Sequence, residues 1–486
     1  MPLKAAQRWL PITLLSMAFI LCLTRFAWLH ADFPNHSPWM RDSAKYTDEG
    51  WWANAAVRHF LIGHWEVAGD YNPAAAVPVW PALLTMVFEF TGVSILAARA
   101  VNVGFSAATV ALLYLLIRRY GGTQTTAAVA AVLLAASPFA FAFSRLATLD
   151  TMVVFEWVLM LWAASHADRE HSWPLPLLGL LFGAMVLTKT TSLALLPSIL
   201  WLLWKRNLRA LFTVTTLAGA VLGLYLLLVL RSRYAGDYHY FFNINALADV
   251  ELGRTGSLLQ QLFHNCLWID RILYPASLAV LILSVVWLRR LWRNPLFAAS
   301  WIAFAGNALY ILRRQDDYSP RYFLVMLVPL ILVLVLTLQE LEIRHRGLAM
   351  LLAATLTVAV FLNTGQIFKF LAHRQYQFYG AAKSIQATVN ADPGAKRLLL
   401  GTSADQLSLM IGIPAINDGY SSEDLTEKVS RYQPGWYVGW NDLDQDILES
   451  LTDYRLDQVA SYPVFDHEDR NQLKLYRMVP LKDERK

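Results

Sequence analysis

The chain has 486 residues, of which 56% are hydrophobic and only 16% are charged, and its mean hydropathy is positive at +0.38. This composition excludes an ordinary soluble enzyme and predicts a membrane protein with many hydrophobic spans. The net charge of +5 does not indicate a nucleic-acid partner, because Lys and Arg fall in pairs between apolar runs and form no single basic face.

The first hydrophobic run, Leu10 to Leu29, is long enough to cross a hydrocarbon core, which takes about 20 apolar residues. Lys4 and Arg8 precede it, so we expect a cytoplasmic N-terminus. The basic start is also typical of a signal peptide, but Trp28-Leu29-His30-Ala31 makes a poor small-residue cleavage site. We therefore interpret the run as an uncleaved anchor.

The first external segment, residues 31–96, carries two adjacent acids, Asp48 and Glu49, at the start of a predicted helix. An N-cap role for Asp48 would stabilise that helix by about 0.5–2 kcal/mol, and Glu49 suits its positive end. Capping is compatible with catalysis, because a capped turn holds the carboxylate rigidly at the outer membrane face. Further on, Pro78 to Phe90 is apolar but short, and we expect a helix lying at the membrane interface.

Eleven hydrophobic runs in all predict about eleven transmembrane helices. Basic pairs such as Arg118-Arg119 and Lys205-Arg206 fall in the turns that this count makes cytoplasmic. An odd number of spans sends the C-terminal tail to the outer side. The runs are Leu10–Leu29, Ala97–Ile117, Thr125–Phe143, Thr151–Ala167, Pro174–Leu187, Thr191–Trp204, Leu208–Leu230, Ile272–Leu288, Pro295–Leu312, Tyr322–Leu338 and Gly347–Phe368.

After the last span the composition changes, which divides the chain into a transmembrane domain, residues 1–370, and a C-terminal domain, residues 371–486. Arg397–Thr402, Gly435–Trp440 and Leu473–Met478 have strand patterns, and Leu443–Leu451 has helical spacing. We expect this α/β domain to bury a modest core of its own. The predicted fold class is a mainly α-helical polytopic membrane protein with a small C-terminal α/β domain on the periplasmic side.

A third acid, Asp150, lies in the short outer loop between the third and fourth spans. Its simplest role is again an N-cap, but the topology puts it on the same face as Asp48, which suggests a site. A divalent metal could bridge Asp48 and Asp150, but no His or further acid stands at ligand spacing. The two cysteines, Cys22 and Cys266, cannot form a zinc site alone. We therefore expect packing roles for the cysteines and neither a metal nor another cofactor.

Two cations, Lys189 and Arg321, also fall on the outer face, against the usual charge bias. Lys189 can simply snorkel to the interface. Cations beside acids at an external face can also hold an anionic substrate, and Arg matches phosphate oxygens with a planar fork. The loop before Arg321 leaves open the alternative of local charge pairing without function, because it contains Arg313, Arg314, Asp316 and Asp317.

Taken in order, these segments resemble the membrane glycosyltransferases of the GT-C superfamily, especially the protein O-mannosyltransferases and the lipid A aminoarabinose transferases. The resemblance spans most of residues 1–370, and the tail looks like the variable outer domain of some members. The matching landmarks are Asp48-Glu49, the stretch from Gly63-His64-Trp65 to Pro81, Gly92-Val93-Ser94 with Arg99, Arg145 to Asp150, Leu187-Thr188-Lys189, and Pro320-Arg321-Tyr322.

The chain departs from the family pattern at three places. Asn72-Pro73 replaces a His/Lys-Pro-Pro type sequence, which puts a particular sugar donor such as aminoarabinose in doubt. Thr190 stands where a glycine is common, and Gly50-Trp51 follows the acid pair.

The resemblance implies an inverting glycosyltransferase that moves a sugar from a polyprenyl-phosphate carrier to a protein, lipid A or glycan acceptor at the periplasmic face of the inner membrane. The implied catalytic residues are Asp48 as the base, Asp150 to orient the acceptor or the first-loop helix, and Glu49 as a secondary support. The implied donor-phosphate residues are Lys189, Arg321 and Tyr322.

Two other classes remain as alternatives: a lipid or glycan transporter or flippase, and an inactive GT-C-like assembly subunit. Transporters usually place polar residues near the midplane, on broken helices in repeated halves. In this sequence the charged candidates cluster at span ends and no repeat is evident, so we favour the enzyme. Glycoside hydrolysis by Asp48 and Glu49 is disfavoured, because neighbouring residues at a helix start do not face each other across a sugar.

Overall fold

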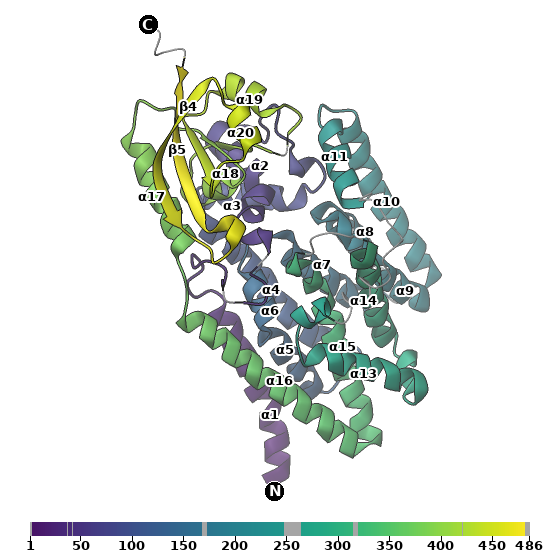
Figure 1. Cartoon of the computed structure of the whole chain (residues 1–486). Coiled ribbons are helices and arrows are strands. Elements are labelled where there is room, and N and C mark those ends of the chain that lie inside the picture. Colours follow the sequence, from purple (N-terminus) through teal and green to yellow (C-terminus); the bar gives the residue numbers. More distant parts are fainter. Residues whose placement is uncertain are drawn as a thin grey trace.

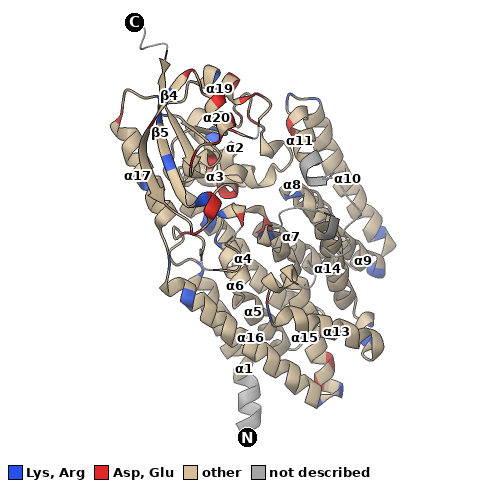
Figure 2. Ribbon diagram, in the orientation of Figure 1, with Lys and Arg blue, Asp and Glu red and all other residues tan. Residues whose placement is uncertain are grey.

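The computed structural model describes residues 2–35, 37–40, 42–167, 173–246, 264–313, 319–419 and 421–481. Figure 1 shows a body of helices with a small sheet at one end, and the two termini at opposite ends. Charged residues gather around the sheet and at the far ends of several helices, and the ribbon between is largely uncharged (Figure 2). An uncharged belt of helices suits a chain that crosses a bilayer, since a helix satisfies its own backbone hydrogen bonds.

Every predicted hydrophobic run forms helical structure. Four helices among the described residues are long and apolar enough to cross a membrane alone, or five if a bent pair counts as one span, and others are shorter. The total of about eleven spans therefore stays a prediction. The helices are α1 (Pro2–Thr24), α4 (Ile95–Arg119), α5 (Gln124–Ala135), α6 (Pro138–Ser144), α7 (Leu149–Ala164), α8 (Pro174–Thr188), α9 (Leu196–Arg206), α10 (Leu208–Leu230), α13 (Leu273–Val286), α14 (Pro295–Arg313), α15 (Leu324–Arg344) and α16 (Arg346–Ala372).

The third predicted span, Thr125–Phe143, is broken instead of continuous, and α5 and α6 are bent by 59°. Pro138 lacks an N–H and disfavours helical geometry in the residue before it. The Arg25 guanidinium, fully buried, donates to the carbonyl oxygens of Leu134 and Ala135 at 3.0 and 2.9 Å. The buried guanidinium thus donates hydrogen bonds to carbonyl oxygens that lose their usual helical N–H donors, four residues further on, at the break.

The first external segment contains η1 (Ser43–Lys45), α2 (Asp48–Ile62) and α3 (Val79–Thr91). The helix α3 agrees in its range with the predicted helix Pro78–Phe90, and its place at the membrane interface stays a prediction. After α10 the chain continues into α11 (Ala235–Ala246), beside α10 in Figure 1. Short 3-10 turns also lie at residues Asn265–Trp268 (η4) and Pro320–Phe323 (η6), just before α13 and α15.

The tail forms a five-stranded sheet with strand order β2-β1-β3-β5-β4. The strand β1 pairs in parallel with β2 and β3, whereas β5 pairs antiparallel with β3 and β4. The predicted strands β1, β3 and β5 and the predicted helix α20 are present. The remaining elements were not predicted. The strand β4 carries a bulge between Gln458 and Ala460, which interrupts the alternation of more buried and more exposed residues along the strand. The elements are α17 (Gln377–Ala391), β1 (Leu399–Leu400), α18 (Ala404–Ile411), β2 (Ala415–Ile416), α19 (Leu425–Tyr432), β3 (Trp436–Trp440), α20 (Gln445–Ser450), β4 (Tyr454–Pro463) and β5 (Gln472–Pro480).

The tail shares its main hydrophobic cluster with the first external segment. Tail residues such as Ile385 and Leu407 belong to the same buried cluster as Trp80 of α3 and Ala53 of α2. At Gly50 in α2, a Cβ atom would lie 2.2 Å from the backbone nitrogen of a residue in α18, so only glycine permits this approach. The layer formed by α2, α3 and α18 therefore joins the sheet to the helical body (Figure 1).

Candidate active site

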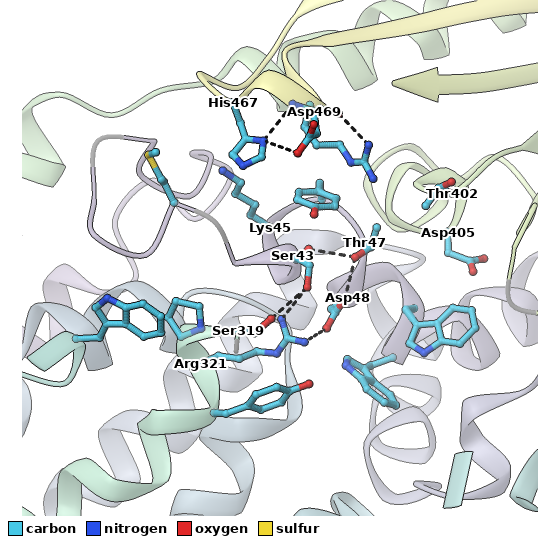
Figure 3. Close-up of a pocket in the computed structure, with 18 of the residues that line it drawn as sticks. Ser43, Lys45, Thr47, Asp48, Ser319, Arg321, Thr402, Asp405, His467 and Asp469 are labelled. Carbon is cyan, nitrogen blue, oxygen red and sulfur yellow. Dashed lines mark hydrogen bonds and ion pairs between the residues drawn. The ribbon is translucent and has the colours of Figure 1, made fainter. Parts of the chain in front are cut away.

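A pocket of about 1190 Å³ lies between the sheet domain and the ends of the helices. Its walls come from residues 38–52 of the first external segment, from the turns η4 and η6, and from the tail. Figure 3 shows Asp48 and Arg321 at its lower side, Lys45, His467 and Asp469 at its upper side, and Thr402 and Asp405 at a third side. With Tyr240 and Phe241 of α11, several segments that are far apart in the sequence thus enclose one cavity.

Arg321 is the central cation of this pocket. Its Nη1 lies 2.6 Å from Asp42 Oδ1, its backbone nitrogen donates to Asp42 Oδ2 at 2.9 Å, and its Nη2 forms an ion pair with Asp48 Oδ2. Pro320 opens the turn η6, which sets Arg321 at the head of α15 with its side chain only 6% exposed. The acids Asp316 and Asp317, considered as its partners, lie outside the described residues.

Asp48 is not the N-cap of α2, so that part of the sequence interpretation is wrong. The helix begins at Asp48, its N-cap is Thr47, and no side chain makes a capping hydrogen bond. The Asp48 carboxylate instead pairs with Arg321 and accepts a hydrogen bond from Thr47 Oγ1 at 2.9 Å. It is 14% exposed, lines the pocket, and lies in the first turn of a helix, where a negative charge is favoured.

Asp150 is not an N-cap either, because Thr148 precedes α7 and no side chain caps that helix. Its Oδ1 accepts from Lys189 Nζ at 2.5 Å, and its Oδ2 lies 4.0 Å from Arg321 Nε. Asp150 and Lys189 are both buried and do not line the pocket. They form a second row of charges behind Arg321.

Tyr322 lies between the two predicted phosphate-binding cations. Lys189 Nζ is 4.6 Å from the centroid of its ring, and the Arg321 guanidinium carbon is 5.1 Å from it. Both contacts are within the range of cation–π interactions. The aromatic ring lines the pocket, so it stands between the cavity and Lys189.

Glu49 points away from the pocket into the protein and is fully buried. Its two oxygens accept from Arg99 Nε and Nη2 at 2.7 and 2.6 Å, and from the backbone nitrogen of Ala147 at 2.8 Å. Gln406 of α18 donates to it at 3.1 Å and accepts from the Gly50 backbone nitrogen at 2.7 Å. These bonds fix the first turn of α2, and with it the position of Asp48.

Asp42, Lys45 and the tail residues of the pocket were not predicted from the sequence. Asp42 is fully buried, and its Oδ1 also accepts from the Ala44 backbone nitrogen at 2.9 Å. Burial raises the pKa of the Asp42 carboxyl, although Arg321 opposes this shift. Asp42 lies in the same external segment as Asp48, and this shared location could have identified it as a candidate site residue. The tail residues gave no such signal, since their contacts join positions more than 300 residues apart.

The charges around Arg321 do not suggest a metal site. Three acids, Asp42, Asp48 and Asp150, share two cations, Arg321 and Lys189, in direct or near contact. Within the described ranges, no group of three or more His, Cys, Asp or Glu side chains is placed to hold a metal ion. The absence of a metal requirement stays a prediction.

Comparison with known proteins gives one family match and several similar structures. Residues 73–231 match the model of the dolichyl-phosphate-mannose-protein mannosyltransferase family. That segment contains Asp150 and Lys189 but neither Asp48 nor Arg321. No curated protein sequence matches the chain significantly.

Structural similarity extends over almost the whole chain. ArnT from Cupriavidus metallidurans in the apo state is 15% identical, with 97% of this chain and 98% of ArnT covered and a TM-score of 0.62. ArnT bound to undecaprenyl phosphate is 15% identical, with 96% and 97% covered and a TM-score of 0.61. The chain has the GT-C fold.

A further solved structure has a similar fold. The oligosaccharyltransferase of Archaeoglobus fulgidus, tethered to an acceptor peptide with an NVT sequon, is 12% identical, with 90% of this chain and 70% of that chain covered and a TM-score of 0.57. The resemblance to GT-C proteins inferred from short motifs is therefore confirmed at the level of the fold, as is the fold class of a polytopic helical protein with a small C-terminal sheet.

Proposed function

We propose that the protein is an inverting glycosyltransferase that moves a sugar from a polyprenyl-phosphate carrier to an acceptor hydroxyl. The observation that carries the proposal is a partly exposed carboxylate, Asp48, held by Arg321 on the wall of a pocket of about 1190 Å³ in a GT-C fold. One similar structure, ArnT bound to undecaprenyl phosphate, supports the choice of carrier.

In this mechanism Asp48 is the general base. The acceptor oxygen attacks the anomeric carbon while Asp48 takes the hydroxyl proton, and the bond from the anomeric carbon to the phosphate oxygen breaks. Attack from the side opposite the phosphate inverts the anomeric centre and releases polyprenyl phosphate. Proton transfer to a positioned carboxylate typically contributes about 10²- to 10⁴-fold in rate.

Arg321 and Lys189 stabilise the charge that gathers on the leaving phosphate, with Tyr322 beside them. Both cations are already paired with acids, but an arginine has five N–H donors and a lysine has three. Arg321, which lines the pocket, can therefore keep its carboxylates and still donate to a phosphate oxygen. Lys189 lies behind the Tyr322 ring and contributes its positive charge from there. Donors aimed at developing charge are often the largest contribution to catalysis.

Asp150 and Glu49 act behind the reacting groups. Asp150 holds Lys189 and lies near Arg321, so it orients the phosphate-binding cations. This differs from the role expected from the sequence, in which Asp150 orients the acceptor or the first-loop helix. Glu49 anchors the first turn of α2 through Arg99 and is a support, as expected.

The predicted orientation of the N-terminus gives the location of the protein and of its pocket. With a cytoplasmic N-terminus, the pocket and residues 371–486 face the periplasm, and the enzyme is a multi-pass protein of the inner membrane. The carrier tail lies along the helices in the bilayer, where each buried methylene favours it by about 0.8 kcal/mol. The acceptor class is a protein, lipid A or a glycan, and no nucleotide sugar is needed on the outer side.

Replacement of Asp48 by Asn tests this proposal. We expect Asp48→Asn to lower the release of polyprenyl phosphate from a glycosylated short-chain carrier by about 10²-fold or more, because the amide cannot take a proton. Glu66→Gln is the matched control, since Glu66 is an acid of the same external segment that pairs with Arg233 and does not line the pocket.

The melting temperature of both variants shows whether the fold is intact. Near wild-type transfer by a folded Asp48→Asn variant would remove Asp48 as the base. No transfer by the wild type with any tested acceptor extract would favour an inactive assembly subunit or a transporter.

A further inference from the structure

Lys45 is a buried amine on the wall of the pocket. The residue is only 4% exposed, and its Nζ lies 4.4 Å from the centroid of the Phe465 ring. Figure 3 shows it above Asp48 and Ser43, on the side formed by the tail. Among the residues that the structure describes, no hydrogen bond or salt bridge to its amine is found within the usual distances.

Other buried cations of the described residues have hydrogen-bonding partners, either carboxylates or, for Arg25 and Arg145, carbonyl oxygens. Arg321 and Lys189 are held by carboxylates, and Lys428 in α19 pairs with Asp70. A buried charge is costly to keep unless a partner compensates it. The cation–π contact of Lys45 with Phe465 supplies only about 0.5–2 kcal/mol. An amine that faces a cavity without an anion in contact is therefore suited to receive one from a ligand.

The fold fixes where this amine lies. Asp42 accepts from Ala44 and so closes the turn η1, whose last residue is Lys45, three positions before Asp48. The ring on which the amine rests belongs to the tail, just before the loop 466–470. A second cation of that loop, Arg470, stacks over the ring of Tyr46 at 5.4 Å and also lines the pocket.

Burial and two nearby carboxylates set the pKa of the Lys45 amine. Asp42, on its own turn, and Asp466, from the tail, both raise its pKa, but burial dominates and lowers the pKa of the Lys45 amine to about 8. Asp42 is already occupied by Arg321 and the turn backbone. The site around Lys45 therefore keeps a cation that is protonated at neutral pH.

We propose that Lys45 binds a phosphate group of a substrate in the upper part of the pocket. The inference rests on the proposed glycosyl transfer and names the chemistry of one more contact in that site. The phosphate belongs either to the carrier itself or to an acceptor that carries one, such as an acidic glycolipid. A protonated amine and a phosphate oxygen form a charge-assisted hydrogen bond in both cases.

The test compares Lys45→Met and Lys45→Arg with the wild type in full-length purified protein. Methionine keeps the packing against Phe465 and removes the charge. The matched control is Lys383→Met in α17, an exposed lysine that also lies near an aromatic ring, Tyr379, but outside the pocket. The variant Lys45→Gln serves as a second uncharged replacement, and melting temperatures verify folding.

Two probes distinguish the source of the phosphate. The first is a short-chain polyprenyl phosphate, with the matching polyprenol as its control, and the second is glycerol phosphate titrated onto carrier-saturated protein. We expect Lys45→Met to weaken the binding of one probe about tenfold or more, as loss of a charged hydrogen bond implies, and Lys45→Arg to restore most of it.

The two binding measurements show which phosphate, if either, contacts Lys45. Weaker binding of polyprenyl phosphate assigns Lys45 to the carrier, and weaker binding of glycerol phosphate alone assigns it to the acceptor. Unchanged affinity for both probes in folded Lys45→Met and Lys45→Gln overturns the inference. Because binding is measured without transfer, that result leaves the role of Asp48 to its own experiment, so the two proposals fail separately.

Discussion

Asp42 provides a quantitative test of how the charges at the pocket support each other. Its carboxylate accepts three hydrogen bonds, from Ala44 N at 2.9 Å, from Arg321 Nη1 at 2.6 Å and from Arg321 N at 2.9 Å. Asp42→Ala removes all three and leaves part of a buried guanidinium uncompensated, so we expect a loss of about 3–5 kcal/mol in unfolding free energy. Asp42→Asn keeps one acceptor oxygen, and we expect a smaller loss of about 1.5–3 kcal/mol.

Denaturant unfolding of the detergent-solubilised protein, followed by tryptophan fluorescence, measures these losses. A double-mutant cycle with Arg321→Met isolates the Asp42–Arg321 interaction, because the loss of the Arg321 contact with Asp48 is common to Arg321→Met and the double variant and cancels. We expect a coupling energy of at least about 1 kcal/mol. Transfer activity should fall in both Asp42 variants, since Arg321 loses the anchor that holds it beside Asp48. Additive losses, or an Asp42→Ala variant as stable as the wild type, would refute the assigned network.

Three further predictions concern other contacts of the site. Lys189→Met should destabilise the protein by about 3–5 kcal/mol by leaving Asp150 unpaired, and adding Asp150→Leu should restore stability but not transfer; additive losses would contradict this. Gln406→Leu should cost about 1–3 kcal/mol and lower kcat with KM little changed, because the buried N–H of Gly50 loses its acceptor; a change in KM alone would argue against a positioning role. Phosphate binding through Lys45 should weaken as the pH rises through about 8, where its amine loses the proton, and Lys45→Met should abolish this dependence when affinity is measured between pH 6.5 and 9.5.

The helices of the transmembrane part were predictable, because a helix that crosses the hydrocarbon core needs a run of about 20 apolar residues, which is visible in the sequence. Residue ranges such as Leu208–Leu230 agree with the helix found. The break between α5 and α6 was not predicted, although Ser137-Pro138 is a local signal for it. What the sequence does not reveal is the compensation by Arg25, which is a contact between distant residues.

For the candidate site, the residues were predictable from the sequence but their contacts with one another were not. Asp48, Asp150, Lys189 and Arg321 were selected because each places a charge at a span end on one predicted face, and the structure brings all four together. Their pairing was not predictable, because capping and ion pairing have the same sequence signal at a helix start. The roles of these residues in transfer stay proposals until the variants are measured.

The tail was the least predictable part. Its strands alternate well enough to be found, but the loop 466–470 shows no motif, and its place above the pocket depends on packing against the first external segment. The tail has a modest core of its own around Leu400, Tyr437 and Met478, as expected. The larger cluster shared with the first external segment was not expected, because apolar residues shared between two segments look the same in sequence as residues of one core.

The bond between Gly50 and Gln406 also has a consequence for biosynthesis. The two residues are 356 positions apart in the chain. At about 5–20 residues per second, a ribosome needs roughly 20–70 s to make the intervening stretch. During that time the helix that presents Asp48 is already translated, while α18 and the upper wall of the pocket do not yet exist. The nascent chain therefore has no complete site until the loop 466–470 has been synthesised.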